Sequence, residues 1–282
     1  MVENTFSNKF YQGDYWLAPS VAQQDKLTSP IGVVNEKNQD ITHPAISEKP
    51  LTIFLNSQEI ITAMTIGDHP NYLAIGFLVN QKILTSDDAI TAVEVDDELG
   101  VVVVRTKQPT HFEIKTKKKI VTSGCGQGTV FGDIMDEVDK TKITSDTKIS
   151  TQQLQNLLKK IALTPSLYLT AGAIHGCALA VGDVPKIYVE DVGRHNAVDK
   201  IAGYMWQHGI SGHDKIFYTT GRLTSEMVIK CLLMDIPILV SRNGFTLYGA
   251  KLARHANMTM VARARGDRFM IVAGKDRILF AK

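Results

Sequence analysis

One cysteine lies within the glycine-rich stretch TSGCGQGTV, residues 122–130, and is well placed for nucleophilic chemistry. The glycines around Cys125 remove side-chain bulk, so its sulfur can be reached and the backbone can bend. A lysine-rich run at residues 115–119 would favour the nucleophilic thiolate if it folds back over the loop. The residues alone leave two alternatives open, a buried inert cysteine and a lysine run that is only a solvated strand face.

The other two cysteines, Cys177 and Cys231, lie in apolar runs and are expected to pack in the core. Three widely spaced cysteines argue against a disulfide framework and for a reducing compartment, so we expect the protein in the cytoplasm. Neither C-x-x-C nor H-E-x-x-H occurs in the sequence, and no zinc site is expected.

Arginines mark four predicted turns in the second half of the chain. They are Arg194, Arg222 and Arg242, together with the run RARGDR, which comprises Arg263, Ala264, Arg265, Gly266, Asp267 and Arg268. Guanidinium groups present forks of donors that suit phosphate, and three of the four turns follow predicted strands. Open α/β sheets bind ligands at the carboxyl ends of their strands. We therefore predict a polyanionic ligand, either a nucleotide or a dinucleotide.

A purely structural role is the alternative for residues in these turns. Asp191 or Asn196 could simply cap a helix, with Arg194 paired to Asp199. His175, within TAGAIHGCA, could add a hydrogen-bond donor to the site or could be satisfied inside a strand pair.

The hydrophobic patterns predict which elements position these residues. Residues 1–48 are rich in polar residues and predict a loosely ordered arm. In residues 49–147 we expect a small α+β domain, with hairpins at 51–66 and 90–106, a helix at 68–84 and a strand at 111–124 that leads into Cys125. The connector at 126–147 closes this domain.

Residues 148–282 alternate between predicted strands and helices. Strands are expected at 166–183, 186–193, 215–220, 236–241, 259–265 and 268–274. Helices are expected from Ser150 and at 194–209, 224–235 and 246–258. This alternation is typical of a sheet with helices on its faces.

Composition excludes some classes of function. The chain has 282 residues, of which 44% are hydrophobic and 21% charged, as expected of a packed core. Its formal net charge of +2 gives no reason to expect nucleic acid as a partner. The polar N-terminus lacks a secretory signal, and no apolar run is long enough to predict a membrane helix.

Seven segments occur together in the order found in one family. They are GFLVNQKI, TSGCG, TAGAIHG, YVEDVGRHNAVDKI, GRLTSEMV, IPILVSRNGFT and ARGDRF. On these segments, about residues 50–280 resemble the FdhD family of formate dehydrogenase accessory proteins.

The resemblance implies a sulfur carrier. Such proteins take sulfur from a cysteine desulfurase as a persulfide and pass it to the bis(molybdopterin guanine dinucleotide) molybdenum cofactor, which formate dehydrogenase requires. It also implies a small β-rich, roll-like N-terminal domain, a cytidine-deaminase-like α/β/α sandwich and a homodimer. By position, the persulfide cysteine falls on Cys125 and the cofactor-binding stretch falls on the RARGDR run.

The cysteine loop departs from the family pattern. Many members carry C-x-x-C, whereas this chain reads CGQG, with Gly128 in place of the second cysteine. One thiol can hold a sulfane sulfur, but release must then rely on direct attack by the acceptor or on another reductant. A cofactor-binding chaperone without sulfur chemistry is therefore the alternative. A deaminase-like enzyme is disfavoured, because the H-x-E and P-C-x-x-C metal signature is absent.

Overall fold

The computed structural model describes residue 11 and residues 13–110, 138 and 140–280 of the chain. Cys125, the lysine run before it and the strand predicted at 111–124 lie outside the described residues.

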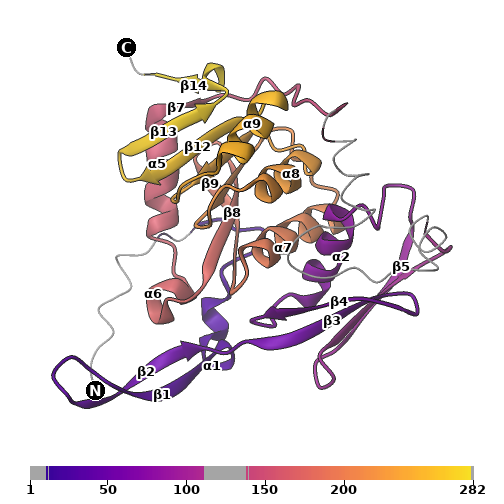
Figure 1. Cartoon of the computed structure of the whole chain (residues 1–282), viewed down its shortest axis with the longest axis vertical. Helices are drawn as coiled ribbons and strands as arrows, with labels where there is room; N and C mark the ends of the chain where they lie inside the picture. Colours follow the sequence, from indigo (N-terminus) through magenta and orange to yellow (C-terminus); the bar gives the residue numbers. More distant parts are fainter. Residues whose placement is uncertain (1–10, 12, 111–137, 139, 281–282) are drawn as a thin grey trace.

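The described elements agree with most of the predicted pattern (Figure 1). The first half contains a 3-10 helix η1 (Ser20–Gln23), α1 (Gln24–Leu27), β1 (Thr28–Val34), β2 (Asp40–Ile46), β3 (Lys49–Leu55), β4 (Gln58–Thr65), α2 (Pro70–Asn80), β5 (Ile90–Asp96) and β6 (Val101–Thr106). The second half contains β7 (Ile149–Ser150), α5 (Thr151–Ala162), α6 (Leu167–Ala171), β8 (His175–Val181), β9 (Val184–Asp191), α7 (Arg194–Gln207), β10 (Lys215–Thr219), α8 (Ser225–Leu233), β11 (Ile238–Ser241), α9 (Leu247–His255), β12 (Thr259–Arg265), β13 (Arg268–Ala273), η2 (Lys275–Arg277) and β14 (Ile278–Leu279).

The smaller sheet has the strand order β4-β3-β6-β5. Alternate residues Leu51, Ile53 and Leu55 of β3 are buried, as the period of two in a strand requires. They share one apolar cluster with Leu73 and Leu78 of α2. Both predicted hairpins and the predicted helix at 68–84 are thereby confirmed.

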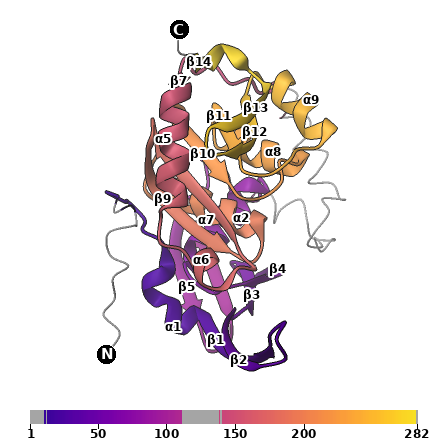
Figure 2. The ribbon, with the colours of Figure 1, turned by 90° about the vertical axis from the view of Figure 1, so that its left-hand side faces the viewer.

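The larger sheet has the order β13-β12-β11-β10-β8-β9. Strands β10, β11 and β12 are parallel, whereas β8 is antiparallel to both β10 and β9. Helices α7, α8 and α9 pack on one face and α5 packs on the other (Figures 1 and 2). The prediction of a sheet covered by helices is confirmed.

The two halves meet where α2 crosses α7. A Cβ atom at Gly203 would lie only 1.9 Å from the backbone oxygen of Tyr72, and one at Gly76 only 1.7 Å from that of Asp199. The helix backbones therefore touch at this crossing, which only residues without side chains permit.

The predicted N-terminal arm contains ordered elements in its described part. Within the part of the chain that the structure describes, strands β1 and β2 pair only with each other, and most of their residues are exposed. Before them, Leu17 forms a parallel bridge with Ile187 of β9, and Trp16 donates its N–H to the oxygen of Lys186 at 2.7 Å. This part of the arm therefore covers the edge strand of the larger sheet, which would otherwise offer unpaired backbone groups.

The strand predicted at 166–183 is wrong in its first half. Residues 167–171 form α6, and only His175–Val181 form β8. The N-cap side chain of Ser166 accepts the N–H of Leu169, and the Glu190 carboxylate accepts two further N–H groups of the first turn. These partners satisfy amides that a helix start leaves unpaired, so tertiary contacts override the apolar pattern.

Candidate functional site

The arginine-bearing turns lie along one edge of the larger sheet. Because β9, β10, β11 and β12 run in the same direction, their carboxyl ends meet at this edge. Arg194, Arg222 and Arg242 follow β9, β10 and β11, and Arg265 ends β12. The edge therefore collects positive charge from four separate turns.

The first group of cations lies where α7 and α8 begin. Burial and the positive charge of Arg222 lower the pKa of Arg194. Burial also lowers the pKa of His175, and the positive charges of Arg194 and Arg222 lower it further. Among the described residues, Nε of Arg194 and Oγ1 of Thr224 are buried without a hydrogen-bond partner. Two adjacent guanidinium groups and unpartnered donors are chemically suited to an anion.

His195 belongs to this group but carries no charge at neutral pH. Burial, together with Lys230 and Arg194, lowers its pKa to about 3. Its Nε2 lies 3.2 Å from Glu226 Oε2, a contact between a neutral ring and a carboxyl group rather than an ion pair. His195 can therefore offer an anion only neutral hydrogen bonds.

The second group lines a cavity of about 190 Å³ between the sheet, α5 and α6. Arg242 and Arg265 lie at this cavity with Ala264 and Gly266, and Nε of Arg265 donates to the backbone oxygen of Arg242 at 3.3 Å. Aromatic rings complete it: Tyr168, Tyr188 and Tyr218. A cavity with planar rings and guanidinium groups suits a flat, polar heterocycle that carries phosphate.

Thr220 connects the two groups. It lines the cavity, and its Oγ1 accepts the N–H of Gly176 at 3.0 Å and lies 3.4 Å from Nδ1 of His175. The structure thus places the predicted arginines in two neighbouring groups on either side of the sheet edge.

The rest of the RARGDR run lies at the tip between β12 and β13. Arg263, Asp267 and Arg268 are exposed and are not among the residues that line the cavity. Arg263 has a φ of 51° and donates its N–H to the oxygen of Asn243, beside an irregularity in the pairing of β12 with β13. This left-handed residue bends the strand end that brings Arg265 to Arg242.

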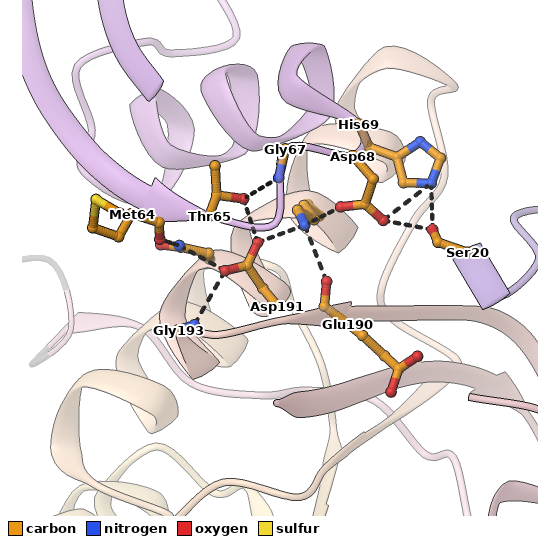
Figure 3. A network of polar contacts seen from close by, with 11 residues as sticks. Ser20, Met64, Thr65, Gly67, Asp68, His69, Glu190, Asp191 and Gly193 are labelled. Carbon is orange, nitrogen blue, oxygen red and sulfur yellow. Dashed lines mark hydrogen bonds and ion pairs between the residues drawn. The ribbon is translucent and has the colours of Figure 1, made fainter. Parts of the chain in front are cut away.

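A buried cluster of charged residues lies at the carboxyl end of β9 (Figure 3). The Lys200 ammonium contacts the carboxylates of Asp68 and Asp191, the latter at 2.6 Å. Asp191 also accepts from Thr65 at 2.5 Å, and Ser20 donates to Asp68 at 2.5 Å. Burial opposes the positive charge, yet the two carboxylates raise the pKa of Lys200 above its ordinary value. This cluster joins the arm, the loop after β4, and α7.

Sequence reasoning missed the tyrosines and Glu190. For two of them the signal is the alternation along β9, where Tyr188 and Glu190 share one face of the strand. The sequence does not say which face of β9 meets the cavity, because that depends on where α5 and α6 pack.

Comparison with known proteins places the chain in a family. The model of the FdhD/NarQ family matches residues 46–279. A "Sulfur carrier protein FdhD" of Bacillus pumilus is 30% identical over 240 residues, 84% of this chain and 91% of the relative. One of Listeria innocua is 30% identical over 244 residues, 85% of this chain and 93% of the relative.

A solved structure agrees with these relatives. The crystal structure of a Desulfotalea psychrophila protein, described as a formate dehydrogenase accessory protein, matches with a TM-score of 0.72 and 27% identity. The match covers 89% of this chain and 98% of that one. The chain therefore belongs to the FdhD/NarQ family, as its motifs predict. Among the described residues, no helix has the length and apolar character needed to cross a membrane.

Proposed function

We propose that the protein is a sulfur carrier that serves formate dehydrogenase. Cys125 receives sulfur from a cysteine desulfurase, and the bis(molybdopterin guanine dinucleotide) molybdenum cofactor, held at the arginine-bearing edge, accepts it. The cofactor is thus the substrate of the reaction. The assembly of two cation groups and an aromatic cavity at one sheet edge, in a chain of this family, carries the proposal.

The two groups fit the two chemical parts of such a substrate. Arg194 and Arg222 are suited to phosphate oxygens, because each guanidinium offers several N–H donors. The cavity beside Arg242 and Arg265 is suited to a guanine base, because tyrosine rings line it. The described residues offer no nucleophilic thiol there, since burial raises the pKa of Cys177 to about 12.

The transfer is balanced without an added oxidant. The Cys125 thiolate attacks the outer sulfur of the desulfurase persulfide, so a new S–S bond forms while the desulfurase thiolate leaves. An electron-rich acceptor on the cofactor then attacks the outer sulfur now on Cys125. That acceptor supplies the electron pair of its new bond to sulfur, and the Cys125 thiolate leaves.

Labelling tests the carrier step. The protein is incubated with a cysteine desulfurase and radiolabelled cysteine, and label is counted under non-reducing conditions. Wild-type protein and Cys177→Ala should both be labelled, whereas Cys125→Ala should lose the label. Cys125→Ala labelled as strongly as wild type would remove the mechanism.

Intact mass separates the proposal from the cofactor-binding chaperone, which the CGQG loop favours. A carrier gains the mass of one sulfur atom after incubation with the desulfurase and cysteine. A chaperone gains none but still retains a guanine-containing molybdenum cofactor.

A further inference from the structure

The short helix α6 forms one wall of the cavity. Ser166, Tyr168 and Leu169 line the cavity from this side, and the Tyr168 ring centre lies 5.9 Å from the guanidinium carbon of Arg242. Because α6 has only five residues, its own hydrogen bonds cannot hold it in place. Its position therefore depends on contacts with the sheet.

Glu190 provides two of these contacts. Its side chain is fully buried, its Oε2 accepts the N–H of Leu167 at 2.7 Å, and its Oε1 accepts the N–H of Tyr168 at 3.0 Å. Figure 3 shows that this carboxyl group points away from the cluster of Asp68 and Asp191. Both oxygens are thus directed to α6.

The segment after α6 has the geometry of a pivot. Gly172 has φ 68° and ψ −139°, a conformation open to glycine, and Ala173 has a φ of 35°. Three further contacts hold α6: Leu167 is buried in a small apolar cluster, Ser166 hydrogen-bonds to Tyr188, and Oγ1 of Thr170 lies 3.4 Å from Oε1 of Gln24. A five-residue wall beside this pivot can swing when its contacts with the sheet loosen.

We propose that Glu190 is a positioning residue of the cavity: through two backbone N–H groups it holds α6 as a hinged wall that places Tyr168 against Arg242. This inference rests on the proposed cofactor site, in which α6 is the element that moves.

The charge of Glu190 makes this hinge sensitive to pH. Burial raises the pKa of Glu190 to about 7, although its bonds to Leu167 and Tyr168 lower it. Asp68 raises this pKa further and Lys200 lowers it, while burial keeps the nearby Tyr188 hydroxyl neutral.

The direction in which pH shifts the opening of α6 follows from the pKa of Glu190 in the closed and open states. Opening α6 would hydrate the carboxyl group and return its pKa toward 4.5, the ordinary value. The closed wall therefore binds the proton more tightly than the open one. Protonation favours closing, so opening becomes easier as pH rises from 4.5 to 7 and levels off above 7.

Hydrogen exchange of the full chain tests the hinge. The peptide covering residues 164–173 is followed from pH 5 to pH 8, with intrinsic exchange rates divided out. In wild type, its opening constant should rise about tenfold per pH unit between pH 5 and pH 7, whereas Glu190→Gln should show no such rise. Glu94→Gln, the same change on exposed β5, should follow wild type, and α5 should not share the profile. A flat wild-type profile, or equal slopes in wild type and Glu190→Gln, overturns the proposal.

Binding of guanosine diphosphate, measured by calorimetry at pH 8, tests the role in the site. This probe carries the base and a pyrophosphate. Glu190→Ala, which removes both acceptors, should bind it about fivefold more weakly than wild type, at least the effect of one lost hydrogen bond, and Tyr168→Ala should also bind more weakly. Equal affinities in all variants would overturn the positioning role. No binding to wild type would instead overturn the proposed cofactor site, while the exchange profile still decides the hinge.

Discussion

At the scale of single residues, the buried ammonium of Lys200 balances the charge of two buried carboxylates. It is 0% exposed and contacts Asp68 and Asp191, which are themselves almost fully buried. Its N–H groups also reach the backbone oxygen of Glu190 at 3.0 Å. Removing the ammonium would leave two carboxylates in the interior without a counter-charge.

Lys200→Met should therefore lower the free energy of unfolding by roughly 3–5 kcal/mol, the usual effect of breaking a buried ion pair. Lys186→Met is the matched control, because its partner Asp14 is 90% exposed, and it should change stability by less than about 1 kcal/mol. Urea denaturation at pH 7 measures both. Equal small effects would mean that the buried cluster contributes little.

At the scale of elements, the crossing of α2 and α7 sets how closely the two halves approach. Gly76 and Gly203 bring each helix against the backbone of the other. The same helix α7 begins with Arg194 and contains Lys200, so its position also determines one cation group of the site.

Gly203→Ala should force these helices apart, because the added carbon would lie 1.9 Å from a backbone oxygen. We expect a loss of stability of roughly 1–3 kcal/mol, typical of overpacking. Gly32→Ala on exposed β1 has no atom within 4 Å of the added carbon and should change the melting temperature little. A similar shift in both variants would contradict the close crossing.

At the scale of the whole molecule, buried contacts join the arm to both sheets. Ser20 of the arm, Asp68 after β4 and Lys200 of α7 form one buried cluster, and Trp16 lies beside β9. Parts joined in this way are expected to unfold together.

The two tryptophans allow a test of this cooperativity. Trp16 lies on the arm, and Trp206 of α7 packs against the core of the smaller sheet. In Trp206→Phe and Trp16→Phe, the single remaining tryptophan should report the same urea midpoint as circular dichroism of that variant. An earlier midpoint for Trp16 would show that the arm detaches first.

The sequence predicts much of this architecture but only part of the site. Turn residues such as Asn56 and the helical spacing after Ser150 are local signals, so the hairpins and α5 could be predicted. The start of α6 depends on Glu190, which lies 23 residues further along the chain from Leu167. No local pattern contains that contact, nor the division of the arginines into two groups. The role of Cys125 stays a prediction, since it lies outside the described residues.

The contact between the arm and β9 also has a consequence for biosynthesis. Asp14 and Lys186 bond to each other although they are 172 residues apart. A ribosome that adds about 5–20 residues per second needs roughly 10–30 seconds to make the chain between them. During that interval the segment around Leu17 has no strand to join. The segment around Leu17 therefore stays without its partner strand until β9 has been made.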